Sequence, residues 1–228
     1  PHGVIAPFRS APRAAQALPE HLTSVLVTPL RIPPPWLEFQ PFATYSGTHS
    51  AAEAARIIRR QWISEPGNIG RLLALTDSIT VAFPPGGDIA ASVRHPHTGI
   101  EARFSLEYVI AAMLLYDDLR MTDFAEGPVN PEVMALAAKV HRTPDETAPP
   151  DAINPALRFH EVTLMLTDGR QLSCRRTRQE SLAEPVNVRE KLALALQQET
   201  ADSRQSVVDD CRLTDSRQLN HLINALLA

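Results

Sequence analysis

The 228 residues carry 44% hydrophobic and 21% charged side chains, with a formal net charge of −4. This is ordinary globular composition, with room for one large domain or two small ones. Nucleic-acid-binding domains are normally basic, so the charge balance argues against a nucleic-acid partner. No stretch reaches the roughly 18–20 apolar residues that span a bilayer, so we expect no membrane segment.

The two cysteines, Cys174 and Cys211, are too few for a disulfide framework. We interpret both as free thiols in a reducing compartment, and the N-terminus lacks the apolar region of a signal peptide, so we expect a cytoplasmic protein. No motif implies a cofactor, because Gly86-Gly87 marks a turn rather than a phosphate loop. The chain begins with proline, which indicates that it is processed, trimmed or a piece of something longer.

Proline-rich stretches divide the first half of the chain. Residues 1–35 are expected to be irregular and end in three consecutive prolines. Residues 50–63 predict a helix in which Ser50 and Glu53 form a capping box. A short helix is expected at 71–75, and the β-branched alternation of 78–83 predicts a strand.

Residues 104–116 predict a helix with almost no polar face, since Glu107 is its only charged residue. Such a helix must be covered on nearly every side. Tyr108 lies in its first turns, and a buried phenol needs a hydrogen-bond partner. Tyr108 is therefore either a proton donor presented to a pocket or a core tyrosine bonded to a backbone carbonyl.

The second half predicts a helix at 131–140, a hairpin of strands 159–166 and 171–176 around an Asp-Gly turn, and helices at 188–200 and 215–227. No continuous strand–helix–strand alternation is present, so the predicted class is α+β, a small mixed or antiparallel sheet with packed helices. We divide the chain into an irregular segment 1–35, an α+β domain 36–180, and C-terminal helices 181–228.

Two segments resemble the MmgE/PrpD family, which includes 2-methylcitrate dehydratase and cis-aconitate decarboxylase. One is Glu-Ala-Arg-Phe-Ser-Leu-Glu-Tyr at 101–108, followed by an Ala-rich apolar helix. The other is 39–49, in which Pro41, Thr48 and His49 match the family pattern but Gln40 replaces its lysine. Glutamine donates only neutral hydrogen bonds, whereas an ammonium can hold a carboxylate or move a proton.

The resemblance implies a lid-like α+β domain followed by helices that return to a large helical domain, with the active site between the two. This chain is similar to the lid and the returning helices alone. We therefore expect a homodimer, or a partner chain that supplies a helical domain. The implied activity is lyase or isomerase chemistry on a small di- or tricarboxylic acid, with Tyr108 and His49 handling protons. The alternative is a non-catalytic truncated homologue that acts as a binding or oligomerisation module.

Four residues complete the predicted site as candidates for substrate binding: Gln40, Thr48, Arg103 and His97. Arg103 could hold a carboxylate with two hydrogen bonds or lie on the surface. His49 precedes the start of a helix, where amide groups favour an anion, but it could equally only pack or cap.

The loop before 101–108 contains two histidines, His95 and His97, on either side of Pro96. No Cys, Asp or Glu stands beside them at ligand spacing, so we predict no metal site. The loop is then either simply polar or faces the substrate.

Overall fold

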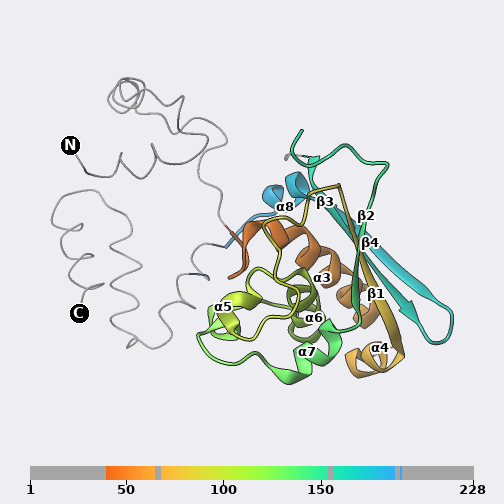
Figure 1. Ribbon diagram of the computed structural model, residues 1–228. Helices are drawn as coiled ribbons and strands as arrows, with labels where there is room; N and C mark the ends of the chain where they lie inside the picture. The colour runs from red at the N-terminus through yellow and green to blue at the C-terminus, as the bar shows by residue number, and fades with distance from the viewer. Residues whose placement is uncertain (1–39, 65–67, 154–156, 188–190, 192–228) are drawn as a thin grey trace, which may run out of the picture. The chain divides into compact units, whose positions relative to one another are not determined.

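A computed structural model describes residues 40–64, 68–153, 157–187 and 191 of the chain. These residues form an α+β fold in which helices cover one face of a four-stranded sheet (Figure 1). The strands are β1 Thr76–Phe83, β2 Val140–Pro144, β3 Phe159–Leu166 and β4 Gln171–Thr177, in the spatial order β2-β1-β3-β4. β1 pairs in parallel with β2 and antiparallel with β3, and β3 pairs antiparallel with β4. The predicted α+β class is confirmed, and the sheet is mixed.

Two long helices form the centre of the helical layer. α3, His49–Ser64, packs against β3 and β4, and α6, Leu106–Tyr116, packs against α3 and α7, Pro131–Ala137. Every residue from Leu106 to Leu114 is buried, as expected for a helix without a polar face. The shorter elements are η2 Ser46–Thr48, α4 Ile69–Leu75, α5 Gly99–Ala102, η3 Met121–Phe124 and α8 Arg178–Ala183.

No helix within the described ranges is long and apolar enough to cross a membrane.

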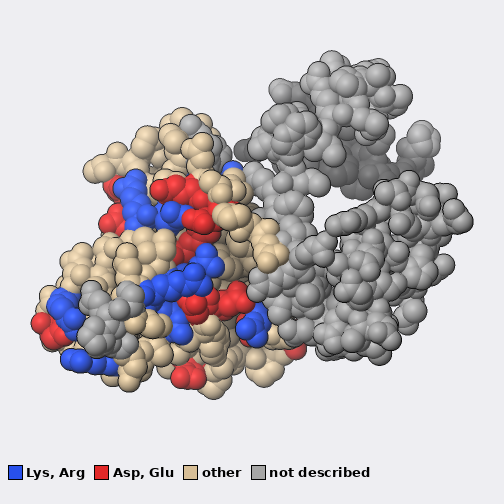
Figure 2. All heavy atoms as spheres, turned by 180° about the vertical axis from the view of Figure 1, so that it is seen from behind, with Lys and Arg blue, Asp and Glu red and all other residues tan. Residues whose placement is uncertain are grey.

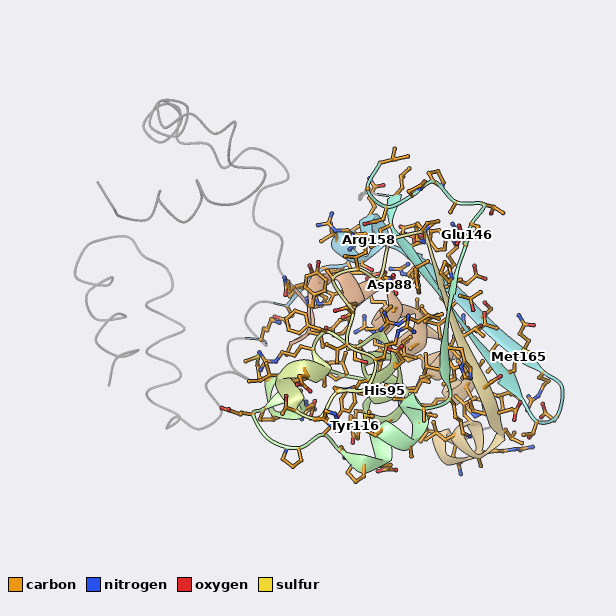
Figure 3. The ribbon with its side chains drawn as sticks, in the orientation of Figure 1. Asp88, His95, Tyr116, Glu146, Arg158 and Met165 are labelled. Atoms are coloured by element: carbon orange, nitrogen blue, oxygen red, sulfur yellow. The ribbon has the colours of Figure 1, made fainter. Side chains whose placement is uncertain are left out.

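The two faces of the sheet differ because side chains alternate along each strand. Val81 pairs with Val162 on the inner face, where both are fully buried against the helices. Thr163 pairs with Ser173 on the outer face, and Met165 lies on the same side (Figure 3). The β3–β4 hairpin is confirmed, with Gly169 at a φ of 85° in its turn.

Three polar side chains interrupt the otherwise apolar inner face of the sheet. Each meets a buried polar side chain of a helix: His160 with Ser50 at 2.7 Å, Arg176 with Glu53 at 3.4 Å, and Arg142 with Glu107 at 2.7 Å. The sheet and the helical layer are therefore joined by specific polar pairs as well as by apolar packing.

Two predictions are wrong: the capping box of the first helix and the end of the helix predicted at 131–140. Ser50 and Glu53 do not form a capping box, because Ser50 bonds to His160 and the Glu53 carboxylate accepts from the Ser181 hydroxyl at 2.8 Å. The predicted helix 131–140 ends at Ala137, and residue 140 begins β2 because it pairs with β1. Segment 1–35 and the helices predicted at 188–200 and 215–227 lie outside the described residues, apart from Lys191.

Candidate functional site

His49 occupies the first position of α3. It is 6% exposed, and its ring lies edge-on to Phe42 with the ring centroids 5.4 Å apart. Its Nε2 atom lies 3.2 Å from the carbonyl oxygen of Thr44. A carbonyl oxygen only accepts, so in the neutral ring Nε2 carries the hydrogen and Nδ1 is the basic atom. Burial lowers the pKa of His49 from 6.5 to about 4, so the ring is neutral at pH 7.

Thr48 and Gln40 flank the same motif but differ in exposure. The Thr48 hydroxyl is fully buried, donates to the Tyr45 carbonyl at 2.8 Å and lies 3.0 Å from the Thr44 hydroxyl. It therefore closes the turn that leads into α3. Gln40 is exposed at the beginning of the described residues. The whole start of α3, residues 49–52, is buried, so this helix end is not an open surface.

Tyr108 lies in the first turn of α6, where its amide donates to the N-cap residue Ser105 at 3.2 Å. The side chain is 2% exposed, and its ring packs edge-on against Phe124. The amide of Asn130 donates to the phenolic oxygen at 3.2 Å. The partner is a backbone donor rather than a backbone carbonyl, so the phenol can still donate its own hydrogen. Burial raises the pKa of Tyr108, which keeps the phenol protonated at neutral pH.

Asn130 connects Tyr108 to a second tyrosine that the sequence analysis did not single out. Its side-chain amide donates to the Tyr116 hydroxyl at 2.8 Å, while its Oδ1 atom accepts from the Glu132 amide and caps α7. Tyr116 is 41% exposed at the end of α6. The available signal was spacing alone, since Tyr116 follows Tyr108 by about two helical turns.

Arg103 is half-buried rather than on the open surface. Its Nη2 atom donates to the Phe124 carbonyl at 2.9 Å, so Arg103 and Tyr108 contact the same residue. Its Nε atom is buried and has no hydrogen-bond partner among the described residues. A buried donor without a partner is costly, and a bound acceptor would remove that cost.

The two motif segments that resemble the family lie side by side. The Tyr45 amide donates to the Arg103 carbonyl at 3.1 Å, and the Tyr45 ring stacks on Phe104 with the centroids 5.7 Å apart. His49 and Tyr108, far apart in the sequence, therefore come from segments that are hydrogen bonded to each other.

The histidine loop plays a structural part through its backbone. The His97 amide donates to the Glu101 carboxylate at 2.7 Å, which helps to cap α5, while the His97 ring is exposed. His95 lines a cavity of about 410 Å³ that also borders His141 and Arg142. Within the described ranges, no three His, Cys, Asp or Glu side chains gather closely enough to hold a metal ion.

A second cavity, of about 490 Å³, is bordered by Pro41 and Phe42 of the first motif and by Tyr116 at the end of the Tyr108 helix. Neither cavity is lined by His49 or Tyr108 themselves. Basic and acidic side chains of the described residues lie next to one another on the face shown in Figure 2, rather than in patches of a single sign.

Comparison with known proteins adds one finding. The family model described as the MmgE/PrpD C-terminal domain matches residues 42–211. The match includes most of the first motif segment, all of the second and the four strands of the sheet. No curated protein matches the chain at a significant level.

Proposed function

The chain belongs to the MmgE/PrpD family, and from this premise we propose that it carries out lyase or isomerase chemistry on a small di- or tricarboxylic acid. The reaction is a dehydration, decarboxylation or epimerisation at a carbon next to a carboxylate, on a substrate such as 2-methylcitrate or cis-aconitate. The observation that carries the proposal is the Tyr108 phenol, which accepts a hydrogen bond from the Asn130 amide and keeps its own hydrogen for donation.

Such reactions need one group that removes a proton and one that delivers it. In a dehydration, a base takes the proton from carbon and an acid protonates the departing hydroxyl, so that water leaves. Tyr108 is the candidate acid because its oxygen accepts from the Asn130 amide and its own hydrogen is available for donation. His49 is the candidate base because its Nε2 hydrogen faces the Thr44 carbonyl, which leaves Nδ1 without a proton at pH 7.

Arg103 supports the proposal as a group that binds a carboxylate. Its buried Nε atom has no partner among the described residues, and its Nη2 atom already holds the guanidinium against Phe124, the residue on which Tyr108 packs. A guanidinium fixed in this way is pre-organised for a carboxylate next to the reacting carbon.

The test is turnover of 2-methylcitrate and cis-aconitate by the chain, alone and with any co-encoded partner. Tyr108→Phe removes only the hydroxyl, and we expect a loss in kcat of about 100-fold or more. Tyr45→Phe is the matched control, with kcat expected to stay within about threefold of the wild type. Unchanged turnover in Tyr108→Phe would remove Tyr108 from the mechanism.

A second candidate function is a non-catalytic binding or oligomerisation module. It is favoured by Gln40 in place of the family lysine, and by the absence of His49 and Tyr108 from the lining of both cavities. In this case the chain pairs with a second copy of itself or with a partner chain. Light scattering after size exclusion tests the idea, since a monomer with turnover on its own would contradict it.

We infer a cytoplasmic location from the cysteine usage. Cys174 is a free thiol, as expected in a reducing compartment.

A further inference from the structure

The cavity of about 490 Å³ has a strongly charged lining. Four basic and four acidic side chains line it: Arg56, Arg60, Arg120 and Lys191, and Glu53, Asp117, Asp118 and Glu184. Four positive and four negative charges sum to zero, so the lining as a whole is neutral. Which of these charges can contact a ligand therefore depends on which side chains form ion pairs.

All four acidic side chains have basic partners. The ion pairs are Asp117 with Arg60 at 3.0 Å, Asp118 with Arg120 at 3.4 Å, and Glu53 and Glu184 with Arg176 at 3.4 and 2.8 Å. In contrast, Arg56 and Lys191 make no ion pair with a described residue. Because Arg176 comes from outside the lining and neutralises carboxylates within it, Arg56 and Lys191 are the lining cations without an ion-pair partner in the part of the chain that the structure describes.

Arg56 and Lys191 lie against two consecutive residues of the first motif segment, Phe42 and Pro41 respectively. The Arg56 guanidinium carbon lies 5.1 Å from the centre of the Phe42 ring, and the Lys191 ammonium donates to the Pro41 carbonyl at 3.3 Å. The Lys191 ammonium has three donors and makes this one hydrogen bond among the described residues. Two cations that line one cavity suit a molecule with more than one carboxylate.

The position of Lys191 also bears on the replaced family lysine. Pro41, whose carbonyl accepts from Lys191, directly follows Gln40. Lys191 therefore brings a positive charge, from a distant part of the chain, to within one residue of the position where this sequence lacks one.

The cavity lies one contact away from His49 and two contacts away from Tyr108, the two candidates for proton transfer. Phe42, in its lining, touches the His49 ring edge-on. Tyr116, also in its lining, accepts from the Asn130 side chain, and the Asn130 amide donates to Tyr108.

We propose that Arg56 and Lys191 form a carboxylate-binding pair in this cavity, and that Lys191 supplies the charge that the family pattern has at position 40. The choice of a di- or tricarboxylic acid as the ligand rests on the proposed function. Arg56 and Lys191 bind and orient the ligand, and they take no part in proton transfer.

The experiment measures binding of tricarballylate, a tricarboxylate without a leaving hydroxyl, to the full chain by calorimetry at pH 7. We expect Arg56→Met and Lys191→Met each to weaken binding by about tenfold or more. Lys191→Arg retains the charge and should bind within about threefold of the wild type. Arg71→Met, an exposed cation on α4 outside the cavity, is the matched control and should not change binding.

A rescue variant separates a loss of charge from a loss of packing. Gln40→Lys added to Lys191→Met should recover most of the binding, because position 40 directly precedes Pro41, whose carbonyl accepts from Lys191. Circular dichroism checks that each variant is folded. Failure of the rescue variant, wild-type binding in Lys191→Met, or no binding by the wild type at millimolar tricarballylate would overturn the proposal. Turnover that does not depend on Arg56 or Lys191 would support the proposed function but contradict the carboxylate-binding pair. Binding that depends on these two residues, without any turnover, would support the carboxylate-binding pair but contradict the proposed function.

Discussion

Arg142 and Arg56 each line one of the two cavities, yet their surroundings are opposite. The Arg142 side chain is 3% exposed, donates to both Glu107 oxygens at 2.7 Å, and also bonds Asp88 at 2.9 Å. Arg56 rests on the face of the Phe42 ring and has no ion pair among the described residues. The charge of Arg142 is therefore compensated by carboxylates inside the fold, whereas that of Arg56 is not paired with any residue that the structure describes.

This difference shows how a functional cation can be told from a structural one. Removing an arginine from water is costly, and a buried arginine persists only where carboxylates compensate it. Arg142 lies on β2 and has such carboxylate partners, and its pair with Glu107 of α6 joins the sheet to the helical layer. Arg56 is only half-buried and rests on the Phe42 ring, so its charge does not need a carboxylate partner among the described residues.

The largest expected effect comes from breaking the ion pairs that Arg142 makes with Glu107 and Asp88. Arg142→Met leaves the buried Glu107 carboxylate with only the Ser105 hydroxyl at 3.2 Å and the exposed Arg94 at 3.9 Å, and we expect the free energy of unfolding to fall by about 3–5 kcal/mol. Urea denaturation measures the change. Adding Glu107→Leu to the variant should restore much of the loss, because the poorly compensated buried charge is then gone. A loss below about 1 kcal/mol for Arg142→Met would show that the pair does not hold the layers together.

An intermediate effect is expected from acid, acting on the polar pair between Ser50 and His160. Burial lowers the pKa of His160 from 6.5 to about 3. The unfolded chain therefore takes up a proton near pH 6.5, whereas the folded chain does not, and stability falls as the pH drops from about 6.5 toward 3. At pH 5 the loss attributable to His160 is roughly 2 kcal/mol relative to pH 7, and His49 adds to it in the same direction.

His160→Asn tests the contribution of His160, with unfolding by urea compared at pH 7 and pH 5. The variant should lose less stability between the two pH values than the wild type does. His97→Gln, at an exposed ring, is the control and should retain the full acid sensitivity. An equal loss in His160→Asn and the wild type would show that His160 does not set the response.

The smallest effect is expected from Arg56. Arg56→Met removes one cation–π contact and no ion pair with a described residue, so the free energy of unfolding should change by less than about 1 kcal/mol. The same urea titration measures it. A loss as large as that of Arg142→Met would mean that Arg56 is structural too, and would erase the contrast between the two cavities.

Local sequence patterns were sufficient for most elements of the fold. The β3–β4 hairpin follows from an Asp-Gly turn between alternating strands, and the burial of α6 follows from its lack of polar residues. β2 was missed because Val140–Pro144 has no local strand pattern and becomes a strand by pairing with β1. The capping box failed for a similar reason, since Ser50 and Glu53 have partners more than a hundred residues away.

The candidate site was predictable only where a local motif was present. The two motif segments gave His49, Tyr108 and Arg103, and the structure brings the segments together. The donor to Tyr108 is a backbone amide, which no side-chain pattern reveals. Lys191 and Arg56 became candidates because the other charged residues that line the cavity form ion pairs, whereas these two form none with a described residue. Ion pairs between distant residues depend on the tertiary structure, so the sequence alone could not reveal this difference.

The parallel pairing of β1 with β2 has a consequence for how the molecule acquires its site. Residues 84–139 must cross back before these two strands can pair, and this crossover contains α5, α6 and α7, with Tyr108, Arg103 and Asn130. Closing so long a loop is slower than forming the β3–β4 hairpin. We expect the hairpin to appear early in refolding, while the Tyr108–Asn130 contact forms only with the last and slowest kinetic phase.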